Sequence, residues 1–293
     1  MYNYHMKPKS LGTLSILLSA LLYSTYGLFI RNLSTELSIF PQLVLRGLIV
    51  SFLLLLIGYF SHGFKKIDTS DLKTFVLRSL AAFIDFVTII VAFNNLPLGL
   101  TLFVFYAASV LSQYIFGYYV YHERITRVKM LCLLLAFVGL VFIYGNSFTS
   151  FALVPLLAAF ASGTGFGLTM GLNKNLTEKY SFSQVGLFTN VFITLLAIPF
   201  VYFAGGSISF NLSTPTWYWL LGFSAVITAV SYVVLHGYKV LETQVASILL
   251  LAEILFALII GYFFYQEIPT VATLIGGLCI VAALTLPNIS KEE

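Results

Sequence analysis

The stretch GYYVYHERIT at residues 117–126 returns as GYFFYQEIPT at residues 261–270. Five positions are identical, including the acidic pair Glu123 and Glu267, and all are separated by the same 144 residues (261 − 117). A single offset of this kind indicates a duplicated chain. Because an odd number of membrane spans fits into it, we predict that the second copy lies inverted in the membrane, as in many secondary transporters.

The composition is that of an integral membrane protein. Of the 293 residues, 59% are hydrophobic and 9% are charged, and the mean hydropathy is +0.97, whereas a soluble domain carries roughly 25% charged residues. The apolar runs are continuous, which argues against the alternating pattern of a β-barrel. They are about 20 residues long, enough to cross roughly 30 Å of hydrocarbon as helices.

We therefore predict an all-α integral membrane protein with ten transmembrane helices in two inverted five-helix repeats, residues 1–146 and 147–293. The first span is expected to be retained and to direct insertion. The ten predicted spans are residues 10–30, 39–60, 72–95, 99–120, 127–145, 151–171, 183–204, 216–236, 246–265 and 269–287.

The basic residues predict the orientation. With a cytoplasmic amino terminus, nearly all Lys and Arg residues fall in cytoplasmic loops, whereas the outer turns near Pro97, Ser147 and Gly205 carry no charge and only Arg31 lies in an outer loop. The positive-inside rule then places both termini in the cytoplasm. We expect the cytoplasmic (inner) membrane of a prokaryote.

The net charge of +4 is spread over these inner loops, where anionic lipid headgroups of the bilayer attract basic residues, so no nucleic-acid partner is expected. Cys132 and Cys279 lie in apolar spans, and their spacing does not indicate a metal site. No cofactor is expected.

The repeated acids fall at opposite ends of the molecule. Five spans per repeat place Glu123 at the cytoplasmic end of span 4 and Glu267 at the outer end of span 9, so we expect a gating or a structural role for both. Thr126 and Thr270 follow near the start of the next helix, where a hydroxyl can cap free backbone N–H groups.

Residues 253–277 read EILFALIIGYFFYQEIPTVATLIGG across spans 9 and 10. The first half adds Pro41 and Arg46 in span 2, Arg78 opening span 3 and LPLG at 96–99 before span 4. Together with Glu123, these segments resemble the EamA-like branch of the drug/metabolite transporter superfamily, and the resemblance covers almost the whole chain.

Three positions depart from that pattern. Glu253 is followed by Ile254 where the family often has proline, and span 4 reads Ala-Ala-Ser at residues 107–109 where the family often has proline. Asp85 in span 3 stands where the family usually has a small or apolar residue, so this acid is particular to the chain.

Three ionisable residues lie deep inside spans: Asp85 near the middle of span 3, Glu253 near the middle of span 9, and Arg46 in the outer third of span 2. Such a residue costs at least about 2.5 to 3.5 kcal/mol and is usually functional. Removal from water favours the protonated form of a carboxyl group, as a proton-coupled carrier or a cation site requires. Alternatively, each acid is a neutral group that joins two helices. We expect a gating or structural role for Arg46 and a structural role for Arg78.

The resemblance implies that spans 1, 3, 4, 6, 8 and 9 surround a central cavity and that spans 5 and 10 are peripheral. Besides Glu253 and Asp85, the candidates for binding substrate are the polar side chains of those spans: Tyr23, Ser24, Tyr26, Tyr106, Ser109, Gln113, Thr164, Ser231 and Tyr232. The GTGFG run at residues 163–167 follows no strand, so we predict close helix packing or a flexible gate rather than a phosphate loop.

These observations favour a secondary active transporter that moves a small organic metabolite or drug by alternating access, with proton coupling as a further expectation. If the acids contact the ligand, the ligand is an amine, an amino-acid-like compound or another small polar molecule. If they carry only protons, the ligand is neutral or anionic, and Arg46 is then a candidate to assist the binding of an anion. An intramembrane enzyme is not expected, because the four histidines lie at or near loops or span ends, and short loops disfavour a receptor. A monomer and a homodimer remain open.

Overall fold

The computed structural model describes residues 8–96, 98–144, 153–265, 268 and 270–289. The regular structure of these residues is helical, with no strand among them. The first half contains α1 (Pro8–Tyr23), α2 (Tyr26–Leu33), α3 (Ile39–Phe60), α4 (Thr69–Asn95), α5 (Leu98–Tyr121) and α6 (Arg127–Tyr144). The second half contains α7 (Leu153–Thr177), α8 (Phe182–Phe203), α9 (Thr214–Val240), α10 (Thr243–Leu250), α11 (Ala252–Tyr265) and α12 (Val271–Ile289).

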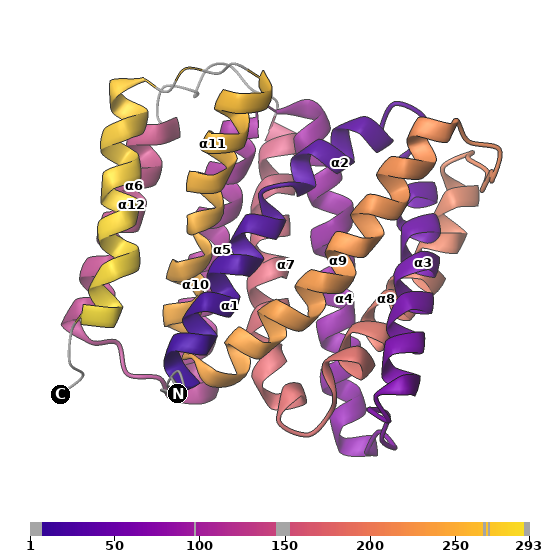
Figure 1. Ribbon diagram of the computed structural model, residues 1–293, viewed down its shortest axis with the longest axis horizontal. Coiled ribbons are helices and arrows are strands. Elements are labelled where there is room, and N and C mark those ends of the chain that lie inside the picture. Colours follow the sequence, from indigo (N-terminus) through magenta and orange to yellow (C-terminus); the bar gives the residue numbers. More distant parts are fainter. Residues whose placement is uncertain (1–7, 97, 145–152, 266–267, 269, 290–293) are drawn as a thin grey trace, which may run out of the picture.

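Eight helical segments of the described chain are long and apolar enough to cross a membrane, and Val271–Leu286 within α12 is a shorter apolar helix. When α1 with α2 and α10 with α11 are each counted as one segment, and α6 is added, the described residues form ten helical segments, which confirms the all-α architecture predicted from hydropathy. The start of α1 and the end of α12 lie at the same edge of the molecule (Figure 1).

The first predicted span is divided into α1 and α2 by a tightened turn. Ser24 Oγ and Thr25 Oγ1 donate hydrogen bonds back to the carbonyl oxygens of Leu21 (2.6 Å) and Leu22 (2.7 Å). Such bonds compete with the regular helical pattern and often bend a helix. The hydropathy pattern predicts one continuous helix here, so the break is a difference from expectation.

The ninth predicted span is divided in the same way into α10 and α11. The N–H of Leu251 bonds the carbonyl of Ile248, and the N–H of Ile254 bonds that of Leu251, both at 3.0 Å. Bonds to the third preceding residue tighten a helix, and a tightened turn within a helix often marks a functional hinge. α1 packs against both α10 and α11, so the two divided segments are neighbours.

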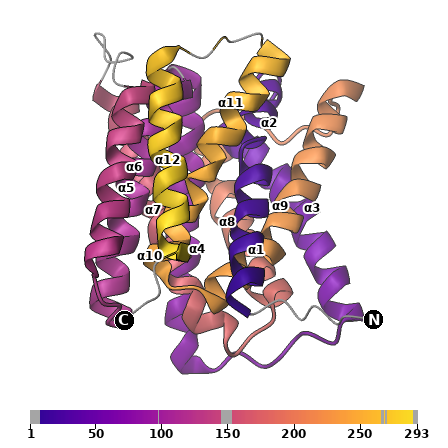
Figure 2. The ribbon, with the colours of Figure 1, turned by 60° about the vertical axis from the view of Figure 1, so that its left-hand side comes forward.

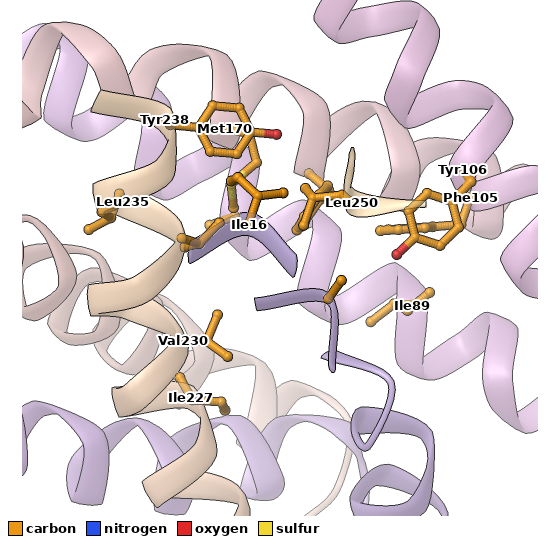
Figure 3. Packing of buried hydrophobic residues seen from close by; sticks show 14 of the residues in the cluster. Ile16, Ile89, Phe105, Tyr106, Met170, Ile227, Val230, Leu235, Tyr238 and Leu250 are labelled. Carbon is orange, nitrogen blue, oxygen red and sulfur yellow. The ribbon is translucent and has the colours of Figure 1, made fainter. Parts of the chain in front are cut away.

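Small residues bring the central helices together. α7 packs against α4 and α5, and its glycine run faces both of them. A Cβ at Gly165 would meet the carbonyl oxygen of Ala81 on α4 at 2.7 Å, and one at Gly167 would meet that of Ser109 on α5 at 2.8 Å. The close packing predicted for this run is confirmed. Figure 3 shows the adjoining core, with Phe105 and Tyr106 of α5 and Ile227, Val230 and Leu235 of α9.

The last helix of each half forms a separate pair. α6 and α12 lie side by side at one edge in both Figures 1 and 2, away from α3, α8 and α9. Their backbones touch, because a Cβ at Gly139 would meet the carbonyl oxygen of Gly276 at 2.7 Å and one at Gly276 would meet that of Gly139 at 2.5 Å. This pair is the peripheral element that the resemblance implies for spans 5 and 10.

The repeated threonines begin the last helix of each half as predicted. Thr126 Oγ1 accepts the N–H of Lys129 (3.3 Å), and Thr270 Oγ1 accepts the N–H of Thr273 (3.2 Å). Each hydroxyl satisfies a backbone donor that has no partner within the helix.

Candidate functional site

A cavity of about 150 Å³ lies among the end of α1 and helices α2, α4, α5, α7, α8, α9 and α11. This space holds several water molecules. Most of its walls are apolar or aromatic. The acidic groups among the lining residues are Asp85 and Glu253, the two carboxylates that the sequence singles out at membrane depth.

Glu253 reaches the cavity because of the turn that divides α10 from α11. It lies in the first turn of α11, with only 9% of the residue exposed. The hydroxyl of Tyr106 on α5 donates a hydrogen bond to Glu253 Oε2. Tyr106 itself is not part of the cavity wall, so its hydrogen bond to Glu253 comes from outside the cavity.

Asp85 enters the cavity from α4 and has a hydroxyl partner of its own. Ser162 Oγ on α7 donates a hydrogen bond of 2.6 Å to Asp85 Oδ1. The close approach of α7 at Gly165, whose Cβ would lie 3.2 Å from the backbone nitrogen of Asp85, brings the two helices within reach. Each cavity acid is therefore hydrogen-bonded to a side-chain hydroxyl on another helix.

The break between α1 and α2 supplies Tyr23, Ser24 and Tyr26 to the cavity wall. The rings of Tyr23 and Tyr26 meet edge to face at 5.0 Å, and Tyr23 meets Phe166 at 5.5 Å. Phe166 in turn contacts Phe105 at 5.3 Å. Aromatic side chains from three regions of the chain thus form a connected wall that suits a flat or apolar ligand.

The two buried arginines have different surroundings. Arg78 lines the cavity, and its guanidinium donates to Asn173 Oδ1 (2.6 Å) and to the hydroxyl of Thr189. Arg46 is 1% exposed and lies outside the cavity wall. Its Cζ lies 4.3 Å from the centre of the Phe86 ring, and Phe86 is a wall residue.

The remaining sequence candidates divide into two groups. Ser231 lines the cavity, although its hydroxyl bonds the carbonyl of Ile227 at 2.9 Å. The others lie outside the wall and have partners elsewhere. These are Ser109 and Gln113, which bond each other at 3.0 Å, Thr164, which bonds the carbonyl of Phe160 at 3.0 Å, and Tyr232, which bonds Ser183.

The wall also contains polar residues that the sequence reasoning did not select. Thr189 and Asn190 come from α8, which corresponds to span 7 and is not among the spans that the resemblance places around a cavity. Thr169 on α7, Arg31 on α2 and Arg78 on α4 also belong to this group. Adjacent polar residues inside an otherwise apolar span were the available signal.

Glu123 lies apart from the cavity, at the end of the molecule where α1 begins. Its Oε1 accepts the backbone N–H of Thr243 (2.8 Å), and its Oε2 accepts that of Gln244 (3.2 Å), so the carboxylate caps the start of α10. Gly117 of the same repeated motif leaves room for it, because a Cβ there would lie 2.6 Å from Glu123 Oε2. Glu267, its counterpart, lies outside the described residues.

Other bonds between the two halves lie at this same end of the molecule, where α1 begins and Glu123 caps α10. We call it the terminal end. Lys129 forms an ion pair with Glu242, next to the capped start of α10. The loop between α3 and α4 is tied to the start of α8, since Gln184 bonds the backbone of Lys65 with both amide atoms (3.0 and 2.6 Å). Lys179 also pairs with Asp71 at 2.9 Å.

Comparison with known proteins assigns the family. The model of the EamA-like transporter family matches residues 10–145 and again residues 153–289. The chain belongs to the EamA-like transporter family. It is an integral membrane transporter, and its environment is the lipid bilayer.

An uncharacterized transporter of Archaeoglobus fulgidus is 26% identical over 282 residues, which cover 94% of this chain and 95% of that protein. A protein of known crystal structure matches with a TM-score of 0.78 at 15% identity, covering 95% of this chain and 98% of the other. This likeness concerns the fold alone.

Proposed function

We propose that this EamA-like transporter is a secondary carrier for a small organic compound, with the central cavity as its binding site. The observation that carries the proposal is the enclosure of two acids, Asp85 and Glu253, in a mostly apolar and aromatic cavity beside two divided helices. In secondary transporters, substrate and coupling-ion sites near the bilayer midplane are typically formed by discontinuous helices.

Alternating access requires gates on both sides of the site. The bonds that join the two halves at the terminal end, around Glu123 and Gln184, fit a closed gate. Two separate matches to one family model, at residues 10–145 and 153–289, support two equivalent halves that exchange roles. We propose that the halves are inverted and that the terminal end faces the cytoplasm, as the basic loops predict.

Two substrate classes differ in the role of the acids. In the first, Asp85 or Glu253 contacts an ammonium group of an amine or amino-acid-like ligand. In the second, the acids carry protons only, and the ligand is neutral or anionic. The hydroxyl partners Ser162 and Tyr106 are compatible with both, because a hydroxyl can donate to a carboxylate or accept from a carboxylic acid.

The test is transport by purified protein in proteoliposomes, after a thermal-stability screen has selected ligands that stabilise the folded state. We expect saturable uptake by the wild type. Glu253→Gln should reduce uptake at least about ten-fold, equivalent to about 1.4 kcal/mol, whereas Glu178→Gln, an exposed acid outside the cavity, should match the wild type.

Comparing exchange with accumulation separates the two substrate classes. If Glu253 carries protons, Glu253→Gln should still exchange labelled for unlabelled substrate but fail to accumulate it against a gradient. If Glu253 contacts the ligand, exchange and binding should fall together. Wild-type rates of both processes in Glu253→Gln would contradict the assignment of this residue to the transport site.

A further inference from the structure

Arg46 has unmet hydrogen-bonding capacity in the interior of the protein. Its Nε and Nη1 find no acceptor among the described residues, although the residue is 1% exposed. Gln42 lies one helical turn earlier on α3, is fully buried, and has neither a donor nor an acceptor partner for its amide in the described structure. Residues four apart share one face of a helix, so two unsatisfied polar groups lie next to each other.

Arg46 contacts the rings of two phenylalanines, one of which lines the cavity. The guanidinium lies 4.3 Å from the ring centre of Phe86 and 5.0 Å from that of Phe223. Phe86 lines the cavity, and Phe223 contacts the ring of Tyr26, another wall residue, at 4.9 Å. Arg46 is therefore one side chain away from the cavity. The face of an aromatic ring attracts the guanidinium cation, but it offers no oxygen atom to accept hydrogen bonds from the N–H groups that lie in the guanidinium plane.

Arg78 shows how the same chain accommodates a buried arginine with protein partners. Its guanidinium has Asn173 and Thr189 as acceptors. The cavity acids likewise have donors, from Ser162 to Asp85 and from Tyr106 to Glu253. Among these four charged groups, Arg46 alone has buried nitrogens, Nε and Nη1, without a hydrogen-bond acceptor among the described residues.

We propose that Arg46, together with Gln42, forms an anion subsite for the carboxylate of an organic substrate whose apolar body occupies the cavity. The Phe86 ring would turn aside to admit the carboxylate. A guanidinium presents parallel N–H donors that match the two oxygens of a carboxylate, and the Gln42 amide supplies a further donor. The proposal rests on the proposed carrier function and narrows its substrates to compounds that bear a carboxylate.

The test uses the full chain in detergent with three probes: sodium benzoate, its uncharged analogue benzamide, and sodium chloride at matched ionic strength. Thermal unfolding is followed for the wild type, Arg46→Met, Arg46→Lys and the exposed control Arg127→Gln. Benzoate should raise the Tm of the wild type and of Arg127→Gln in proportion to its binding, whereas benzamide should not.

The arginine variants should lose the response to benzoate. Arg46→Met should bind it at least about ten-fold more weakly, because hydrogen bonds to a charged group are lost. Without ligand, the Tm of Arg46→Met should equal or exceed that of the wild type, since a buried charge whose Nε and Nη1 have no acceptor is replaced by an apolar side chain of similar length. Arg46→Lys keeps the charge without the planar fork, so it should fold and should also bind benzoate more weakly.

Three results would overturn the subsite. These are no effect of benzoate on the Tm of the wild type, an effect of benzoate on both Arg46 variants as large as that on the wild type, or a large loss of Tm in ligand-free Arg46→Met. An Arg46-dependent effect of chloride as large as that of benzoate would overturn its assignment to an organic carboxylate. Flux in proteoliposomes is measured separately. Arg46-dependent binding without flux would contradict the proposed carrier function and support the subsite. Flux without Arg46-dependent binding would support the carrier function and contradict the subsite.

Discussion

Glu253 lies at the cavity because one turn of helix is wound more tightly than its neighbours. The bond from the N–H of Leu251 to the carbonyl of Ile248 ends α10, and the acid then falls in the first turn of α11. Free N–H groups at a helix start favour a carboxylate. The residue is thus supported by a backbone feature and by the hydroxyl of Tyr106.

Tyr106→Phe tests this support. Removing the hydroxyl leaves Glu253 without a buried donor, so we expect the free energy of unfolding to fall by about 1–3 kcal/mol. Uptake should also fall, but less than in Glu253→Gln. Denaturation in detergent and flux in proteoliposomes measure the two effects. Tyr118→Phe, on an exposed tyrosine of the same helix, is the control. Unchanged stability in Tyr106→Phe would show that the hydrogen bond contributes nothing measurable.

At the scale of helices, the contact between α5 and α7 depends on the absence of side chains. A Cβ on Gly163 would collide with the backbone carbonyl group of Phe105. A backbone carbonyl cannot move aside as a flexible side chain can, so a methyl group here must separate the helices.

Gly163→Ala should therefore destabilise the protein by about 1–3 kcal/mol through overpacking. The matched control is Gly277→Ala on α12, where the new Cβ would meet only the Leu255 side chain, at 3.6 Å. That substitution should stay within about 0.5 kcal/mol of the wild type. Thermal unfolding of both variants is the measurement, and equal Tm values would contradict the packing argument.

The elements could be predicted from the sequence where a pattern extends over many residues. Long apolar runs predicted the ten helical segments, and the glycine run predicted close packing of α7. The breaks at Ser24 and Leu251 could not be found in this way, because a window of about 20 residues averages over a single turn. Ser24 and Thr25 offered a local signal, since hydroxyls compete for helical carbonyls, whereas Leu250, Leu251 and Ala252 offered none.

The site was predictable in its charges and less so in its uncharged members. Asp85 and Glu253 were selected because burying an acid is costly, and both line the cavity. Ser109 and Gln113 lie on a cavity-forming segment but point elsewhere, since hydropathy says nothing about which face of a fully apolar helix meets the cavity. Asn190 was missed because the resemblance does not place its span at the cavity.

On the scale of the whole molecule, the bonds at the terminal end should control the exchange between conformations. Glu123→Gln weakens the cap on α10 without touching the cavity. We expect uptake to fall several-fold while the affinity for a stabilising ligand stays within about two-fold, a difference below the 1.4 kcal/mol that a ten-fold change represents. Flux and ligand-induced Tm shifts measure the two, with Glu178→Gln as the control. Complete loss of ligand affinity would contradict a gating role.

The orientation of the molecule can be tested with single cysteines in a background that lacks Cys132 and Cys279. Gly205 and Lys65 are exposed residues of the α8–α9 and α3–α4 loops, and these two loops lie at opposite ends of the molecule (Figure 1). Because basic loops stay in the cytoplasm, Gly205→Cys should react with an impermeant thiol reagent in intact cells, and Lys65→Cys only after permeabilisation. Labelling of Lys65→Cys in intact cells would contradict the predicted orientation.

The backbone contact between Gly139 and Gly276 gives the molecule a fixed point. Because α6 and α12 meet here backbone to backbone, they have little room to re-pack, so we expect any rocking motion of the two halves to turn about this pair. Spin labels at the exposed residues Leu134 and Leu278 should then keep a constant separation through the cycle. The separation of labels placed across the cavity should change during transport, and the constant separation between residues 134 and 278 provides the reference.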